Sequence, residues 1–323
     1  PSALSPIRHR PFMEILIDIV LPIFGTLFIA YLAARTGLFS TKATEGLATF
    51  VFTFAVPSLL FDTVSRHPLP DPIEWELLIS FFGTAYLVWL AGMMISRWLF
   101  GRDFAHASLA GMTAAFGNTM LGLPLVLTTF GEAGSIPIFL IIAFHSWQFF
   151  ALATILLEGS RRQNGTLKAL PWTIAKSLAT NPILVGLILG LACNILAIPV
   201  PDPVADITGF LGRAALPCAV FVMGASLAKF RITGAIGEAV AGSLLKLIAF
   251  PAMTYIAATY IFTMEPLWRD VAVVMASLPV GINVYLFADR YQAGAPAAAT
   301  SMLLSTFLSF GTIATVLTLL EVR

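Results

Sequence analysis

Two long apolar segments of this chain are each interrupted near their middle by glycine, proline and asparagine. The first interruption lies in FGNTMLGLP, residues 116–124, and the second in ASLPVGIN, residues 276–283. A broken helix leaves backbone N–H and C=O groups without partners, which costs several kcal/mol for each group in lipid. Such breaks persist only where protein covers them or where they line a water-filled cavity. A matched pair in the two halves of a chain predicts a transporter binding site.

The composition indicates a membrane protein. The chain is 58% hydrophobic and only 11% charged, whereas soluble proteins carry about 25% charged residues. A helix of about 20 apolar residues crosses the hydrocarbon core. We expect an all-α membrane protein with ten such segments, of which the fourth and ninth are broken. Their approximate bounds are 14–35, 43–65, 74–99, 104–130, 134–158, 171–197, 205–228, 235–262, 268–290 and 295–320.

Basic residues predict the orientation of these segments. Most lysines and arginines outside the segments lie in loops after odd-numbered segments, such as Lys42, Arg102 and Arg161. Positive residues favour the cytoplasmic side. We therefore expect a multi-pass protein of the cell (inner) membrane with both termini outside the cytoplasm.

Prolines and glycines recur at a constant offset of 160 residues, which indicates an internal repeat. Pro22 corresponds to Pro182, Pro57 to Pro217, and the first interruption to the second. Each half holds five segments, and because five is odd the second half must enter the membrane the other way round. The predicted organisation is a disordered tail over 1–12, a first repeat over 13–158, a cytoplasmic linker over 159–170 and a second, inverted repeat over 171–323.

Four motifs give the chain a family resemblance. They are the Asn118–Pro124 string, FAVPSLLF at 54–61, NPILVGLILG at 181–190 and LPVGINVYLFADRY at 278–291. In these motifs, in their order and over essentially its whole length, the chain resembles the auxin efflux carrier family, which includes plant PIN carriers and bacterial permeases for small organic acids. It lacks the long hydrophilic midpoint loop of the plant carriers, and Asn283 stands where those carriers look apolar.

The resemblance implies an architecture and a mechanism. Ten helices would form two inverted five-helix repeats, as in bile-acid symporters and NhaA-type antiporters. Helices one, two, six and seven would form a scaffold, through which homodimers would assemble. Helices three to five and eight to ten would form a transport unit that moves as an elevator, with helices four and nine crossing at the binding site.

The expected crossing suits a small anion. The N-terminal end of each half-helix carries about +0.5 elementary charge, so two ends attract a carboxylate without a desolvated lysine or arginine. Pro124 suits a first helical turn, Gly122 and Gly281 allow the backbone to approach the ligand closely, and Asn118 and Asn283 orient the carboxylate. The full set expected to bind substrate is Asn118, Thr119, Gly122, Pro124, Pro279, Gly281, Asn283 and Ser58.

Four titratable residues are candidates for coupling or gating: His145, Lys246, Asp18 and Asp62. A charge such as Lys246 at the bilayer centre costs about 2.5–3.5 kcal/mol, so function is the first hypothesis for it. The alternatives are snorkelling or a carboxylate partner for Lys246, and a hydrogen-bonded structural role for His145. A cation held at the opposing carbonyl ends is the alternative to an anion, with Asp18 and Asp62 as its carboxylates.

The function predicted is a secondary or potential-driven transporter of a small organic anion, such as a dicarboxylate or an auxin-like acid. The alternative is a sodium-coupled symporter of the bile-acid type, and a ligand sensor stays open. An enzyme is not expected, because the chain has neither an HExxH nor a GxSxG motif. Cofactors, metals and nucleic acid are not expected either: Cys193 and Cys218 lie in apolar segments, and no basic face is present. The expected partners are the substrate, the bilayer and a coupling H⁺ or Na⁺.

Overall fold

The computed structural model describes residues 12–66, 74–160, 180, 182–232 and 234–321. Residues 1–11 of the predicted tail, 161–170 of the predicted linker and 171–179 of the sixth segment lie outside them. The described residues are helical apart from short connections. The helices are α1 (Phe12–Ile15), η1 (Leu16–Val20), α2 (Leu21–Arg35), α3 (Thr41–Phe50), η2 (Val51–Ala55), α4 (Val56–Arg66), α5 (Glu76–Trp98), α6 (Phe104–Ala115), α7 (Thr119–Phe130), η3 (Gly131–Gly134), α8 (Ser135–Ser160), α10 (Pro182–Ile195), α11 (Asp202–Arg213), α12 (Ala215–Leu227), α13 (Ile236–Leu244), η4 (Leu245–Ala249), α14 (Phe250–Ile256), η5 (Ala257–Ile261), α15 (Pro266–Ala276), α16 (Ile282–Arg290) and α17 (Ala295–Leu319).

Seven helical stretches in the described part of the chain are long and apolar enough to cross a membrane. We expected ten segments. The difference has local causes: the expected fourth and ninth segments are each divided into two short helices, and the sixth is described only as Pro182–Ile195. In addition, α7, η3 and α8 run together from Thr119 to Leu157 as one stretch. The α8 helix continues to Ser160, so it extends past the expected start of the linker at residue 159.

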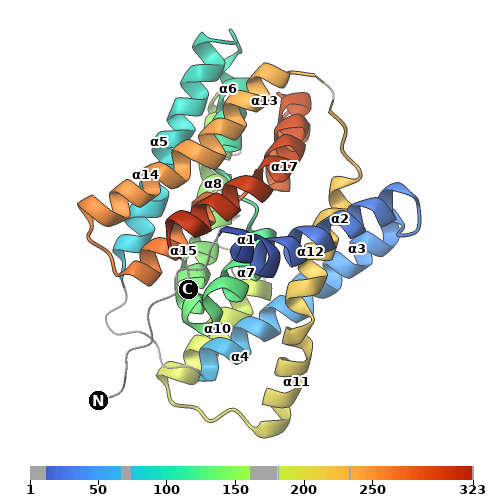
Figure 1. Ribbon diagram of the computed structural model, residues 1–323, viewed down its shortest axis with the longest axis vertical. Helices are drawn as coiled ribbons and strands as arrows, with labels where there is room; N and C mark the ends of the chain where they lie inside the picture. The colour runs from blue at the N-terminus through green and yellow to red at the C-terminus, as the bar shows by residue number, and fades with distance from the viewer. Residues whose placement is uncertain (1–11, 67–73, 161–179, 181, 233, 322–323) are drawn as a thin grey trace.

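The helices gather in two groups that are visible in Figure 1. The helices α5, α6, α13, α14 and α17 pack together in the upper part of the view, and α2–α4 pack with α10–α12 below them. Glycines allow the closest contacts in the lower group. A Cβ added to Gly186 of α10 would lie 2.5 Å from the carbonyl oxygen of Pro57, and one added to Gly190 would lie 3.1 Å from that of Phe61. Small residues let membrane helices approach this closely, which maximises van der Waals contact.

The order of elements in the first half returns in the second. The α5 helix begins at Glu76 and α13 at Ile236, and α6 ends at Ala115 while α15 ends at Ala276. In both halves a short helix then follows an interruption, and a long helix, α8 or α17, comes last. The offset of about 160 residues between proline and glycine positions therefore also describes the helix bounds. The inverted orientation of the halves stays a prediction.

Candidate functional site

The two interruptions meet. The first separates α6 from α7 at residues 116–118, and the second separates α15 from α16 at residues 277–281. Gly117 and Val280 form an antiparallel β-bridge. In it the Asn118 N–H donates to the Pro279 carbonyl oxygen at 2.8 Å, and the Gly281 N–H donates to that of Phe116 at 3.1 Å. The two breaks therefore run in opposite directions and satisfy part of each other's backbone, as a buried break requires.

Asn118 is the N-cap of α7. Its Oδ1 accepts from the Met120 N–H at 3.2 Å, and its backbone carbonyl accepts from the N–H groups of Leu121 and Gly122. This is the ordinary way in which an asparagine begins a helix. The predicted position of Asn118 at the break is thus correct, and its side-chain oxygen is already engaged by the protein.

Fewer amides are bare at the breaks than we expected. The amides of Asn118 and Gly281, and those of Met120, Leu121 and Gly122 in the first turn of α7, have partners. In addition, the Val280 N–H donates to Ser305 Oγ at 3.0 Å. At the starts of α7 and α16, the amides without a hydrogen-bond partner among the described residues are those of Thr119, Ile282 and Asn283. We predicted that the amides at both helix starts would be free. Only some of them are, because each break donates a backbone hydrogen bond to the other.

The structure corrects the expectation for Pro124 and gives the two glycines of the breaks a packing role. Pro124 is the sixth residue of α7 and not part of its first turn, because the Asn118 cap starts the helix earlier. A Cβ on Gly122 would lie 2.7 Å from Leu278 Cδ1, and a Cβ on Gly281 would lie 2.7 Å from the Phe116 ring. Both glycines therefore make room for the opposite break, and a close approach of a ligand to them stays a prediction.

A lysine lies at the meeting point. Lys246 belongs to the π-helical turn η4 and is fully buried. Its Nζ donates to the Ala276 carbonyl oxygen, the last of α15, at 2.6 Å, and it lies 4.7 Å from the centre of the Phe250 ring. A Cβ on Gly117 would be 3.5 Å from the same Nζ. From the sequence we named Lys246 for coupling or gating and not for binding; helix packing brings it to the carbonyl end of the second break.

Lys246 has no carboxylate counterion among the described residues, where the salt bridges all involve other groups. One backbone carbonyl and one aromatic face are the recorded stabilising contacts of its ammonium group. Buried charges in proteins are normally paired. A fully buried lysine without a carboxylate partner in the described part of the chain, next to two helix breaks, is a candidate for binding a negatively charged ligand.

His145 is buried on α8 inside a cage of aromatic rings. Its ring centre is 4.5 Å from that of Phe116 and 5.0 Å from that of Phe149, and its Nδ1 has no hydrogen-bond partner in the described residues. The alternative predicted for His145 was a histidine that is hydrogen-bonded to a neighbour in the core. Its Nδ1 does not make such a bond to the described residues. Through Phe116 the imidazole contacts the first break.

The two aspartates and Ser58 lie elsewhere. Asp62 pairs with Arg66 of the same helix at 2.9 Å and sits where α4 faces α11, while Asp18 is exposed on η1. On α4 it is Val56 and Leu60 that face Thr119, and Ser58 is on the opposite side of the helix, since two residues correspond to about 200° of rotation. The structure therefore does not bring these three side chains to the breaks.

A small cavity adjoins the start of α7. Thr119, Met120 and Leu123 line it from α7, and the opposite wall comes from the lower helix group. The remaining lining residues are Phe52, Val56, Leu60, Ile142, Ile183 and Ala219. Its lining side chains are mostly apolar. Thr119, whose amide has no hydrogen-bond partner among the described residues, contributes to one wall. The cavity can hold the apolar part of a small ligand while polar atoms face the break. Asn283, half-buried in the first turn of α16, has no side-chain hydrogen bond to the described residues.

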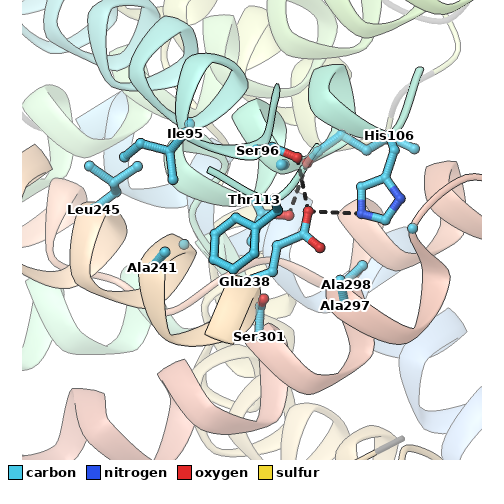
Figure 2. Close-up of a pocket in the computed structure, with 16 residues that line it drawn as sticks. Ile95, Ser96, His106, Thr113, Glu238, Ala241, Leu245, Ala297, Ala298 and Ser301 are labelled. Atoms are coloured by element: carbon cyan, nitrogen blue, oxygen red, sulfur yellow. Dashed lines mark hydrogen bonds and ion pairs between the residues drawn. The ribbon is translucent and has the colours of Figure 1, made fainter. Parts of the chain in front are cut away.

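Sequence reasoning missed a second polar cluster, at the far end of the upper helix group (Figure 2). Glu238 of α13 accepts a hydrogen bond from Ser96 Oγ at 2.9 Å. The same carboxylate lies 2.8 Å from His106 Nε2 and 3.2 Å from Arg102 Nε. The spacing of Glu238, Gly242 and Lys246 at four-residue intervals places them along one face of a helix, and this was the available signal.

Comparison with known proteins identifies the family. The model of the family described as "Membrane transport protein" matches residues 15–317. The chain belongs to this family. It is 32% identical over 309 residues, 94% of this chain and 95% of the relative, to a Rhizobium meliloti protein named "Putative malonate transporter". It is 24% identical over 308 residues, 92% of this chain and 96% of the relative, to an uncharacterised transporter of Methanocaldococcus jannaschii.

The plant branch of the family is also recognisable. Auxin efflux carrier component 8 of Arabidopsis thaliana is 23% identical over 332 residues, which cover 85% of this chain and 89% of the relative. The resemblance to auxin efflux carriers is thereby confirmed. The protein is a multi-pass membrane transporter and not an enzyme.

Proposed function

We propose that this transporter carries small organic anions and binds their carboxylate where the two helix breaks meet. The observation that carries the proposal is Lys246, a fully buried lysine without a carboxylate partner in the described residues, at the carbonyl end of one break and beside Gly117 of the other. A carboxylate next to Lys246 would supply the missing countercharge. The unpaired amides of Thr119, Ile282 and Asn283 would supply hydrogen bonds.

The position of the ammonium group also favours an anion over sodium. A metal cation at such a crossing would bind the carbonyl oxygens at a helix C-terminus. Lys246 Nζ already occupies that place at Ala276. A sodium ion would have to displace this hydrogen bond, and it would be repelled whenever Nζ is protonated. The sodium-coupled symporter therefore receives no support from this arrangement.

Malonate is the first substrate to test. The name of the Rhizobium meliloti relative points to this dicarboxylate, and auxin-like monocarboxylates follow from the Arabidopsis relative. Asn118 and Asn283, one on each break, would orient the carboxylate through their side-chain amides. The apolar cavity beside Thr119 would receive the hydrocarbon part of the substrate.

Alternating access would come from movement of one helix group against the other. In this proposal α5, α6, α8 and α13–α17 form the transport unit with α7, and α1–α4 with α10–α12 form the scaffold and the homodimer contact. The substrate then travels with the breaks, as in an elevator. Inner-membrane location with both termini outside the cytoplasm belongs to the same proposal, and so does an outward flux of anions driven by a negative interior.

The test is uptake of labelled malonate by the reconstituted protein, together with malonate-induced thermal stabilisation. Asn118→Ala and Asn283→Ala each remove one hydrogen bond to a charged group, worth about 1.5–3 kcal/mol, so uptake at low concentration should fall by about 10-fold or more. Asn194→Ala is the control, because Asn194 Nδ2 donates to the Val64 carbonyl oxygen in the lower helix group, away from the breaks.

Two results would contradict the proposal. One is unchanged uptake in both break variants. The other is the absence of binding or uptake for malonate and for every member of a panel of mono- and dicarboxylates. Equal flux in sodium and choline buffers is expected, and a strict sodium requirement would favour the bile-acid type of symporter instead.

A further inference from the structure

The polar cluster around Glu238 connects the solvent with the interior of the upper helix group. The side chain of Arg102 is 41% exposed, that of His106 is 18% exposed and that of Glu238 is 6% exposed. Glu238 is therefore the inner end of a short chain of ionisable groups that starts in water. Figure 2 shows its carboxylate between Ser96 of α5, His106 of α6 and Ser301 of α17.

Small and hydroxyl-bearing residues continue inward from this cluster. A pocket below Glu238 is lined by Thr113 of α6, Gly242 of α13 and Ser301 of α17. A Cβ on Gly242 would be 3.2 Å from Thr113 Cγ2 and 3.8 Å from Ser301 Oγ. The three helices therefore meet at this point through small side chains.

The same line ends at the two breaks. On α13 and η4, Glu238, Gly242 and Lys246 follow one another at four-residue intervals, and on α17 Ser301 is followed by Ser305, which holds the Val280 amide. Ser243, one turn before Lys246, is 1% exposed, and its hydroxyl has no hydrogen-bond partner in the part of the chain that the structure describes. This hydroxyl is therefore available for a hydrogen bond to a water molecule.

The length of the line suits proton transfer. Eight residues of helix separate Glu238 from Lys246, which is roughly 12 Å along the axis, or about four hydrogen bonds of ~3 Å. The hydroxyls of Thr113, Ser301 and Ser243, together with bridging water, can provide the intermediate steps. A metal ion would need a cluster of ligands on this route, and the described residues contain no group of three His, Cys, Asp or Glu side chains.

We propose that the transporter moves a proton together with its anion, along a route from His106 and Glu238 to Lys246. The inference rests on the proposed anion site. When a carboxylate binds beside Lys246, Nζ takes up one proton; Glu238 or His106 gives it up and regains it from water. When the anion is released on the other side of the membrane, Nζ gives the proton to water on that side and becomes neutral again. One ammonium charge then accompanies one carboxylate through the membrane.

Other charged and titratable groups lie near the two ends of the route. Arg102 and His106 face Glu238, Arg97 Nη1 donates to the Arg102 carbonyl, and Asp103 accepts from the His106 N–H. The part of α17 that lines the pocket contributes only alanines and Ser301. Near Lys246 the titratable group within electrostatic range is His145, which the phenyl rings enclose.

The experiment measures malonate binding and malonate-driven proton flux separately. Calorimetry in buffers of different ionisation enthalpy gives the protons taken up on binding by the purified protein, and a pH dye inside proteoliposomes gives the flux. We expect uptake of about one proton in the wild type, and no malonate-driven proton flux in Lys246→Met, which should not bind malonate. In Glu238→Gln we expect malonate binding within about 3-fold of wild type, but proton flux slower by roughly 10-fold or more. Glu45→Gln is the control, because Glu45 forms a 3.4 Å surface pair with Lys229.

Each alternative outcome is distinguishable. Wild-type proton flux in Glu238→Gln, with binding intact, overturns the route and leaves the anion site standing. Malonate transport without proton movement in the wild type overturns proton coupling itself. Loss of the pH dependence in His145→Ala, with Glu238→Gln unaffected, assigns the relay to His145 and refutes the route. Absence of malonate binding in the wild type contradicts the proposed function and not this inference alone.

Discussion

Replacing Lys246 by methionine separates a functional charge from a structural one. Methionine keeps most of the length and volume of the side chain but removes the ammonium group. If Lys246 serves substrate binding, the variant should fold at least as well as the wild type and fail to bind malonate. If Lys246 instead holds the helices together, the variant should be unstable and should keep its affinity for malonate.

The contacts of Lys246 set the expected magnitude. An ammonium at the centre of the bilayer costs about 2.5–3.5 kcal/mol. The hydrogen bond from Nζ to the Ala276 oxygen at 2.6 Å contributes about 1.5–3 kcal/mol, and the Phe250 ring at 4.7 Å about 0.5–2 kcal/mol. These opposing contributions nearly cancel. We therefore expect the free energy of unfolding to change by less than about 1 kcal/mol or to rise, as apolar replacements of buried charges often do.

Malonate binding should respond much more strongly. A charged hydrogen bond to carboxylate worth about 3 kcal/mol corresponds to roughly 150-fold in Kd. The assay is the apparent Tm of the purified protein with and without malonate: the unliganded Tm should hold or rise, and the malonate-induced increase should vanish. Leu247→Met, a volume-conserving change at the neighbouring buried position, is the control. A loss of stability of about 3–5 kcal/mol, the cost of breaking a buried ion pair, with malonate binding retained, would refute the reasoning.

Two further predictions concern packing and the backbone of the second break. Gly224→Ala should lower the free energy of unfolding by about 1–3 kcal/mol, because the new methyl group meets a backbone oxygen of α2. Gly25→Ala, where nothing lies within 4 Å of the added methyl group, should raise the free energy of unfolding by about 0.5–1 kcal/mol. Equal Tm shifts in the two variants would contradict the contact between Gly224 and α2. Ser305→Ala leaves the buried Val280 amide without its acceptor and should cost about 1–3 kcal/mol together with slower malonate uptake. Ser309→Ala, which removes only a bond to the same helix, should have a smaller effect in both assays.

Local sequence patterns were sufficient for the class of the protein and for the position of its breaks. An apolar chain in lipid can satisfy its backbone only as helices, so composition alone predicted the helical fold. Asn118 and Gly281 mark helix starts because an asparagine side chain caps a helix and because Gly281 adopts extended backbone there. These are properties of a few neighbouring residues, and the structure places both breaks within the predicted strings.

Contacts between distant residues decided the rest. The Pro279 carbonyl and the Ser305 hydroxyl accept hydrogen bonds from amides that we had expected to be free for substrate. The Phe116 ring leaves no space for a side chain at position 281. Lys246 reaches Ala276 only because η4 packs against the end of α15. The rotation of each helix about its axis determines such contacts, and it depends on side chains of all its neighbours at once.

The sequence by itself thus determined that this chain forms membrane helices with two interruptions, because hydrophobicity and backbone chemistry act over a few residues. Only the tertiary structure decided which groups meet at the interruptions. It put the side-chain nitrogen of Lys246 at the carbonyl end of the second break and joined His106 to Glu238 across 132 residues of chain. Electrostatic contacts of this kind depend on distances that no local pattern specifies, since they arise when helices far apart in the chain are packed side by side.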